Sequence, residues 1–164
     1  MIDLDTVTPL VTPLAAALRA QGWRLATAES CTGGLIAAAC TTLAGSSDWF
    51  ERGFVTYSNA AKVQQLGVDP ALLATHGAVS EAVVAAMVAG ALMKSPADLA
   101  VAVTGIAGPG GGVPGKPVGT VWLAVMRRGG APRCERLQLD GDRASVRAQT
   151  VVIALQRLRE LCEN

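Results

Sequence analysis

The sequence predicts an α/β fold in three layers, with helices on both faces of a largely parallel sheet. Apolar residues recur at helical spacing in several segments, and short apolar runs lie between these segments. Helices that alternate with strands are typical of βαβ units, whose strands pair in parallel. No stretch marks a domain boundary, so we expect a single domain over residues 1–164.

Helices are expected where apolar residues recur every three or four positions. The strongest pattern follows Ser80 and Glu81, two residues that favour a helix start. Pro9 or Pro13 falls in the first turn of an N-terminal helix, where proline is accepted. The expected helices cover residues 7–20, 32–43, 59–66, 80–94 and 142–162, with a short helical turn at 46–48.

The apolar runs between these helices predict five strands, over residues 23–28, 53–57, 99–103, 118–126 and 134–139. The turn RRGGAP joins the last two strands and predicts that they pair antiparallel. Polar segments follow the first three strands: AESCTGG, TYSNAAK and TGIAGPGGG. Because ligands of such sheets bind beyond the carboxyl ends of the strands, we expect these segments to form one site.

The composition argues against several classes of protein. The chain is 51% hydrophobic and 16% charged, with a net charge of +1. No apolar run reaches the roughly 20 residues of a membrane span, and the acidic stretch MIDLDTVTPL, broken by Pro9, lacks the pattern of a signal peptide. Scattered basic residues and few aromatic residues argue against binding to nucleic acid or to a membrane. We expect a cytoplasmic protein.

The cysteines do not suggest a metal site. Cys31, Cys40, Cys134 and Cys162 form no CxxC pair, and His76 is the single histidine. We therefore expect reduced cysteines and neither a metal ion nor a cofactor.

The glycine-rich stretch GGGVPGKP, residues 110–117, only approximates two phosphate-binding motifs. It contains GxxxxGK, but Pro117 stands where Ser or Thr would hold magnesium, and it also contains GxGxxG. Both motifs need a helix after them, whereas VGTVWLAV reads as a strand. The stretch is either a flexible loop or a loop whose backbone approaches a ligand closely, as glycine permits.

Ser30 in TAESCTGG is both a candidate nucleophile and a candidate helix cap. Gly33 and Gly34 would each weaken a first helical turn by about 1 kcal/mol relative to alanine, which suggests that something must approach the backbone there. Free N–H groups at a helix start can also stabilise an oxyanion. Cys31 is the rival nucleophile.

A serine nucleophile needs a base. His76 lies in the loop-like stretch ATHGAVS and is interpreted as a surface or capping residue. Lys62 in TYSNAAK is the other candidate, because burial or a neighbouring cation lowers the pKa of a lysine. Tyr57, at the end of the preceding strand, is placed to relay or hold the proton. Alternatively, Lys62 is a solvated charge on a helix.

Several motifs, in this order, resemble the CinA C-terminal domain family: TAESCTGGLIA, AGSSDWFERGFVTYSNAAKVQQLGV, HGAVSEAVV, TGIAGPGGG, KPVGTVWLAV and GDRASVRAQT. The resemblance runs from about residue 23 to at least residue 150. It implies a three-layer α/β/α sandwich on a five-stranded, mostly parallel mixed sheet with one antiparallel strand. It also implies a stand-alone amidase of pyridine nucleotide recycling, which hydrolyses nicotinamide mononucleotide to nicotinic acid mononucleotide and ammonia.

The resemblance also implies roles for individual residues. Ser30 corresponds to the family's nucleophile, Lys62 to its base and Tyr57 to the third member of the set. Ser30 would attack the carboxamide while a neutral Lys62 takes its proton, which requires a pKa well below the free value of about 10.4.

Further residues correspond to the family's substrate site. Arg143 and Arg147 in GDRASVRAQT are candidates for the substrate phosphate, because the guanidinium fork suits phosphate oxygens. The remaining positions expected at the substrate are Cys31, Thr32, Gly33, Gly34, Thr104 and Gly105. The sequence departs from the family at Gly110, where other members often carry an acidic residue, and by the lack of a carboxylate in LVTPLAAAL.

Two other functions stay open at this point. The chain can be a non-catalytic nucleotide-binding or interaction module associated with competence and DNA damage, or it can hydrolyse a different amide. The high hydrophobic fraction favours a homo-oligomer, with a dimer as the first expectation.

Overall fold

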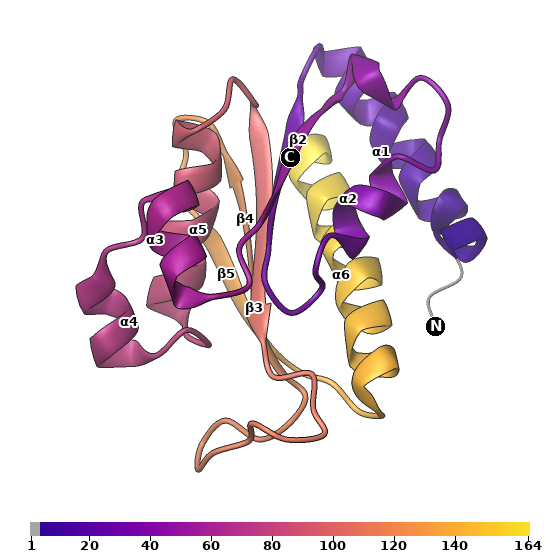
Figure 1. The fold of residues 1–164 in the computed structure, drawn as a ribbon. Helices are drawn as coiled ribbons and strands as arrows, with labels where there is room; N and C mark the ends of the chain where they lie inside the picture. Colours follow the sequence, from indigo (N-terminus) through magenta and orange to yellow (C-terminus); the bar gives the residue numbers. More distant parts are fainter. Residues whose placement is uncertain (1–3) are drawn as a thin grey trace.

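The computed structural model describes residues 4–164 and has a central sheet between two layers of helices (Figure 1). In this part of the chain the strands are β1 (Leu25–Glu29), β2 (Phe50–Val55), β3 (Leu99–Gly105), β4 (Thr120–Arg127) and β5 (Arg133–Gln138). The helices are α1 (Thr8–Gln21), α2 (Leu35–Cys40), α3 (Asn59–Leu66), α4 (Pro70–His76), α5 (Glu81–Met93) and α6 (Arg143–Glu163), with 3-10 turns η1 (Leu4–Val7) and η2 (Ser46–Asp48). Three residues of the N-terminal stretch MIDLDTVTPL lie outside the described residues.

The sheet confirms the mixed, mostly parallel arrangement. Its strand order is β2-β1-β3-β4-β5. β1 pairs in parallel with β2 and with β3, whereas β4 runs antiparallel to both of its neighbours. The expected antiparallel pair across RRGGAP is therefore present, and the carboxyl ends of β1, β2 and β3 lie at one edge of the sheet.

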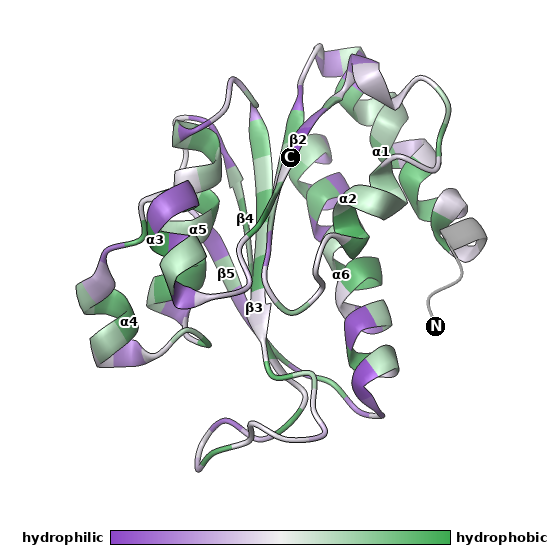
Figure 2. Cartoon of the chain, viewed as in Figure 1, coloured by the Kyte–Doolittle hydropathy of each residue, from purple (hydrophilic) through white to green (hydrophobic). Residues whose placement is uncertain are grey.

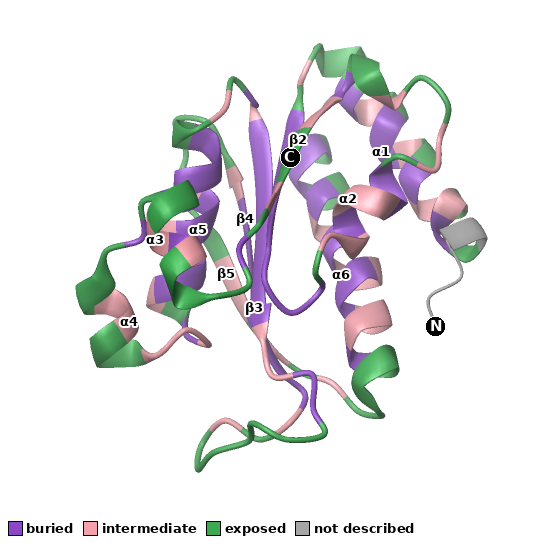
Figure 3. Ribbon diagram, viewed as in Figure 1, coloured by how far each residue is buried: buried purple, intermediate pink, exposed green. Residues whose placement is uncertain are grey.

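Side-chain size on β3 explains how the two helical layers pack. Leu99, Val101 and Val103 point into the core shared with α1 and α6, while Ala100 and Ala102 face the core beneath α5. Successive residues of a strand point to opposite faces, so one face of β3 is bulky and the other is small. The small face lets α5 lie close to the sheet, and the central strands are buried on both sides (Figure 3).

Hydrophobic residues gather on the central strands and on the helices beside them, whereas the first turns of α6 are hydrophilic (Figure 2). Residues that recur at helical spacing along α5 and α6 are buried: Val84, Met87, Val88, Ala91, Leu92, Val151, Leu155, Leu158 and Cys162. Within residues 4–164, no helix has both the length and the apolar character that crossing a membrane requires.

Two of the expected elements differ in the structure, and one helix was not expected. The helix expected over residues 32–43 begins only at Leu35, because Gly33 and Gly34 have left-handed φ angles of 60° and 97°. The strand expected at 53–57 lies at Phe50–Val55, which is the stretch that finds partners along β1. α4 was not expected, although Asp69, which caps it, and Pro70 at its first position are helix-start signals.

Candidate active site

Successive residues at the end of β1 point to opposite faces of the sheet, and the polar residues Glu29 and Ser30 are such a pair. Thr27 and Glu29 lie on the face covered by α2, where the Thr27 hydroxyl donates to Glu29 Oε2 over 3.2 Å. Ser30 follows directly and its side chain reaches the opposite layer, where α3 carries Lys62. The strand end therefore supplies both helical layers with a polar group.

Lys62 is nearly completely buried, with 1% of its surface exposed. Ser58 caps the start of α3 by accepting from the Ala61 N–H over 3.0 Å, and this sets Lys62 on the first turn facing Ser30. Lys62 Nζ lies 3.0 Å from Ser30 Oγ, 3.0 Å from the Thr56 carbonyl and 3.1 Å from the Tyr57 carbonyl. Lys62 thus is not the solvated surface charge considered above.

Burial, rather than the contacts themselves, favours a neutral amine that can accept a proton. Burial lowers the pKa of Lys62 below its ordinary value, and Cys31 acts in the opposite direction. The two carbonyl oxygens can only accept, so they take the two N–H bonds of a neutral amine. The lone pair of Nζ is then left for the Ser30 hydroxyl, which is the geometry of a nucleophile with its base.

Tyr57 contacts the site through its backbone carbonyl and through its phenol oxygen. Its backbone carbonyl accepts from Lys62, whereas its phenol oxygen accepts from Arg143 Nη2 over 3.2 Å. The residue is 62% exposed, so the ring lies toward solvent rather than beneath Lys62. No hydrogen bond joins the phenol to Ser30 or Lys62 within the described residues, and the proton-relay role of Tyr57 stays a prediction.

Ser30 is not the N-cap of α2, and that interpretation was wrong. Gly34 occupies the cap position, and the first amides of the helix, at Ile36 and Ala37, donate to Glu29 Oε1 and Oε2 over 2.8 Å and 2.9 Å. Glu29 is 1% exposed and also accepts from the Thr32 hydroxyl over 2.7 Å. The helix start is therefore satisfied internally and is not open to an oxyanion.

Glu29 is the functional-site residue that sequence reasoning missed. It stands inside the motif AESCTGG, and a carboxylate at the end of an otherwise apolar strand was the available signal.

The loop that follows Ser30 contains backbone N–H groups without a partner in the described part of the chain. In the loop of residues 30–34, the N–H groups of Cys31, Thr32 and Gly34 have no acceptor from another residue within residues 4–164, whereas Ser30 N–H donates to the Val103 carbonyl.

Two neighbouring cavities open at this edge of the sheet. The first has a volume of about 210 Å³ and is lined by Ser30, Cys31, Tyr57, Asn59, Lys62, Ala78, Val79, Thr104, Gly105, Ala107 and Arg143. The second has about 490 Å³ and is lined by Ala107, Pro109, Val118, Gly141, Asp142, Arg143, Ala144 and Arg147. The two cavities share Ala107 and Arg143 and therefore lie side by side.

Thr104 and Gly105 form the β3 side of the first cavity. The Thr104 hydroxyl donates to the Ala78 carbonyl over 3.0 Å, which ties the end of β3 to the segment before α5. A Cβ atom on Gly105 would lie 2.7 Å from Val121 Cγ2 and 3.0 Å from the Thr120 carbonyl oxygen, so glycine is needed where β3 approaches β4.

Arg143 and Arg147, one turn apart on α6, make different contacts. Arg143 Nη1 donates to the Gly108 carbonyl over 3.0 Å, and its other arm reaches Tyr57 across the end of the sheet. Arg147 Nε and Nη2 donate to the carbonyls of Cys31 and Thr32 over 3.1 Å and 3.0 Å. Both arginines thus lie at the second cavity, but only Arg147 contacts the 30–34 loop.

The other candidates for chemistry are not equipped for it. Burial raises the pKa of the Cys31 thiol to about 11, so it stays protonated at neutral pH. All four cysteines are free. His76 ends α4 outside both cavities, and its carbonyl accepts from Lys116 Nζ over 2.8 Å. The glycine-rich stretch leads into β4 rather than into a helix, so it lacks the helix that both phosphate-binding motifs need.

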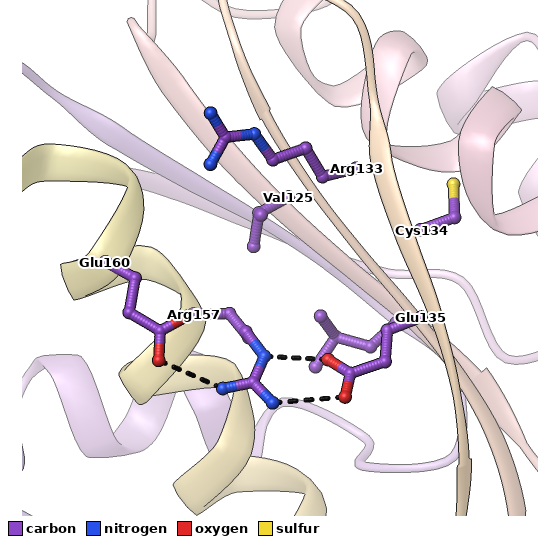
Figure 4. Close-up of a pocket in the computed structure, with 7 residues that line it drawn as sticks. Val125, Arg133, Cys134, Glu135, Arg157 and Glu160 are labelled. Carbon is purple, nitrogen blue, oxygen red and sulfur yellow. Dashed lines mark hydrogen bonds and ion pairs between the residues drawn. The ribbon is translucent and has the colours of Figure 1, made fainter. Parts of the chain in front are cut away.

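A further cavity of about 390 Å³ lies between β4, β5 and α6 (Figure 4). Three of its charged groups, on β5 and α6, bind each other. Arg157 holds both carboxylate oxygens of Glu135, at 2.7 Å and 3.0 Å, and one oxygen of Glu160 at 3.1 Å. It lacks the pairing of a nucleophile with a base, which distinguishes it from the cavity at Ser30.

The chain is similar to known proteins over most of its length. Residues 7–162 match the family model of the CinA C-terminal domain. The chain is 55% identical over 152 residues to the nicotinamide-nucleotide amidohydrolase PncC of Enterobacter agglomerans, covering 92% of this chain and 93% of that protein. It is 56% identical over 158 residues to the protein of that name from Pseudomonas putida, covering 96% and 98%. The crystal structure of the competence/damage inducible protein CihA from Agrobacterium tumefaciens is similar with a TM-score of 0.91 and 46% identity, over 95% of this chain and 94% of that one.

Proposed function

Because the chain belongs to the CinA C-terminal domain family, we propose that it is a nicotinamide-nucleotide amidohydrolase. The reaction is the hydrolysis of nicotinamide mononucleotide to nicotinic acid mononucleotide and ammonia, a step in the recycling of pyridine nucleotides. The observation that carries the mechanism is the 3.0 Å contact between Lys62 Nζ and Ser30 Oγ, with two carbonyls on the same amine.

In the first half of the reaction, Ser30 Oγ attacks the carboxamide carbon while the neutral Lys62 amine takes the hydroxyl proton. The carbonyl oxygen of the substrate becomes an oxyanion, which needs hydrogen-bond donors. In the loop after Ser30, the N–H groups of Cys31, Thr32 and Gly34 have no acceptor from another residue within residues 4–164, and we assign the oxyanion to them. The C–N bond then breaks, and Lys62 returns the proton to the leaving ammonia.

In the second half, water attacks the ester that Ser30 has formed. Lys62 takes a proton from this water, the acid product leaves, and the Ser30 hydroxyl is restored. One water is consumed, and one carboxylic acid and one ammonia are formed. Tyr57 assists by its carbonyl on Lys62 and, in this proposal, by its phenol at the entrance of the cavity.

The two cavities suit the two ends of a nucleotide. The smaller one, which holds Ser30 and Lys62, receives the carboxamide ring beside Thr104 and Gly105. The larger one receives the ribose phosphate, with Arg143 as the cation, whose guanidinium donates to a carbonyl and a phenol. Gly33 and Gly34 carry no side chains in the loop that supplies Ser30 and Cys31 to the smaller cavity.

The test is an assay of the purified protein with nicotinamide mononucleotide and a chelator, in which ammonia and nicotinic acid mononucleotide are measured together. We expect equal amounts of both products. Ser30→Ala removes turnover, whereas Cys31→Ala, the neighbouring substitution, lowers it far less because the thiol is not the nucleophile. A wild-type protein that binds the nucleotide without releasing ammonia would instead support the non-catalytic binding module.

A further inference from the structure

We propose that Arg147 is a positioning residue, which holds the 30–34 loop in the orientation that the reaction needs, and is not a ligand of the substrate phosphate. The proposal rests on the proposed function, because it assigns Arg147 a part in the same reaction. Its basis is the pair of hydrogen bonds from Nε to Cys31 and from Nη2 to Thr32.

The two bonds occupy one whole edge of the guanidinium group. Nε and one Nη form the fork with which arginine grips a carboxylate or a phosphate in bidentate fashion. In Arg147 this edge is already bound to two carbonyl oxygens of the same loop. Arg143, one turn earlier, has Nη1 and Nη2 on separate partners and lies in both cavities. We assign the phosphate role to Arg143 because it lines both cavities and holds no carbonyl of the 30–34 loop in a hydrogen bond within residues 4–164.

The contacts of Arg147 fix the direction of two successive peptide groups. In a trans peptide the C=O and the following N–H point in opposite directions. Since the carbonyls of Cys31 and Thr32 point to Arg147, the N–H groups of Thr32 and Gly33 point away from it. Gly33 N–H closes a turn onto the Ser30 carbonyl over 3.1 Å, and Thr32 N–H remains free for an oxyanion.

The 30–34 loop is also held by a carboxylate, that of Glu29. Glu29 accepts from the Thr32 hydroxyl and from two amides of α2, so Thr32 is bound to Glu29 by its side chain and to Arg147 by its carbonyl. The left-handed Gly33 and Gly34 that follow provide no side chains of their own to hold this conformation. Without Arg147, the peptide groups after Ser30 lose the partner that sets their orientation.

The test compares Arg147→Met with Arg143→Met on two substrates, nicotinamide mononucleotide and nicotinamide riboside, which lacks the phosphate. A misplaced reacting group lowers the rate about 100-fold for a shift of roughly 1 Å. For Arg147→Met we expect kcat to fall roughly 10- to 100-fold by the same factor on both substrates, with little change in KM. For Arg143→Met we expect a higher KM for the nucleotide and little effect on the riboside.

Two results would overturn the proposal: a raised KM of Arg147→Met for the nucleotide alone, or an unchanged kcat. Circular dichroism and thermal unfolding establish that each variant is folded. If Arg147→Met does not fold, Arg147→Lys decides, since its single ammonium cannot hold both carbonyls in the same geometry. An Arg147→Lys protein with the kcat of the wild type contradicts the proposal.

A second readout does not depend on the nucleotide. A sulfonyl fluoride labels an activated serine, and the rate of Ser30 labelling, measured by mass spectrometry with Ser30→Ala as the blank, reports the nucleophile itself. We expect slower labelling in Arg147→Met than in Arg143→Met, and equal rates would refute the positioning role. If the wild type is labelled but releases no ammonia from the nucleotide, the proposed substrate fails while the role of Arg147 is still decided.

Discussion

Lys62 Nζ lies 3.0 Å from Ser30 Oγ, although one residue comes from α3 and the other follows β1. Both are buried at the carboxyl edge of the sheet. The other two contacts of Lys62 Nζ are with the carbonyl oxygens of Thr56 and Tyr57, and not with a carboxylate. The carbonyls hold the amine in place, and its burial lowers its pKa and favours its uncharged form.

Ser30 and Lys62 should behave as one unit in kinetics. Residues that form one catalytic set have strongly non-additive effects. We expect Ser30→Ala and Lys62→Ala each to reduce kcat by roughly 1,000-fold or more, and the double variant to be no slower than the slower single variant. Single-turnover measurements on the nucleotide check this. Multiplication of the two losses in the double variant would show that the residues act independently.

The pH dependence of the reaction should follow Lys62. The base must be uncharged, and the uncharged fraction grows as pH rises through its pKa. Because burial holds this pKa below the ordinary 10.5, we expect kcat/KM to rise with pH and to level off below that value. The profile is measured on the wild type with the nucleotide. A rate that is flat over the range, or that still rises unchanged beyond pH 10.5, would argue against Lys62 as the base.

Glu29→Gln should destabilise the protein because the buried carboxylate serves four donors. A carboxamide has one acceptor oxygen, so at least one amide of α2 faces an NH₂ group. An unsatisfied buried donor reduces the free energy of unfolding by roughly 1–3 kcal/mol, which urea unfolding at pH 7 measures. Asp69→Asn, at the exposed cap of α4, is the matched control and should change it by less than about 0.5 kcal/mol. Equal losses in the two variants would contradict the structure.

Gly90→Ala tests a close approach between helices. Helix propensity alone predicts that alanine stabilises the interior of α5 by about 1 kcal/mol. The structure predicts the opposite sign, because a Cβ atom there would collide with the Leu66 carbonyl at the end of α3. We expect a loss of roughly 1–3 kcal/mol and reduced activity, since α3 carries Lys62. Thermal unfolding measures the loss, and Gly110→Ala, with open space at the Cβ position, is the neutral control.

The fold was largely predictable because each layer repeats one simple pattern. The buried faces of α5 and α6 follow the helical spacing of Val, Leu and Met, and the buried strands are short apolar runs. The meeting of three strand ends was predictable from the parallel sheet, and it correctly brought Ser30, Lys62 and Thr104 to one cavity.

The finer structure around Ser30 was not predictable from local patterns. The role of Glu29 depends on where α2 begins, and that depends on the left-handed Gly33 and Gly34. The contacts of Arg147 join residues more than a hundred positions apart, so neither spacing nor propensity carries them. The sequence resemblance indicated that Arg147 belongs to the site, but only the geometry distinguishes it from Arg143.

The order in which the chain is synthesised gives the bond between α6 and the 30–34 loop a further meaning. The ribosome makes Ser30 and Lys62 early, but the partner of their loop lies 116 residues after Cys31. A nascent chain that lacks α6 contains the nucleophile and the base without the helix that aligns them. In the proposed mechanism, full activity is therefore expected only once the last helix has been made, and a truncated chain that lacks α6 should be far less active.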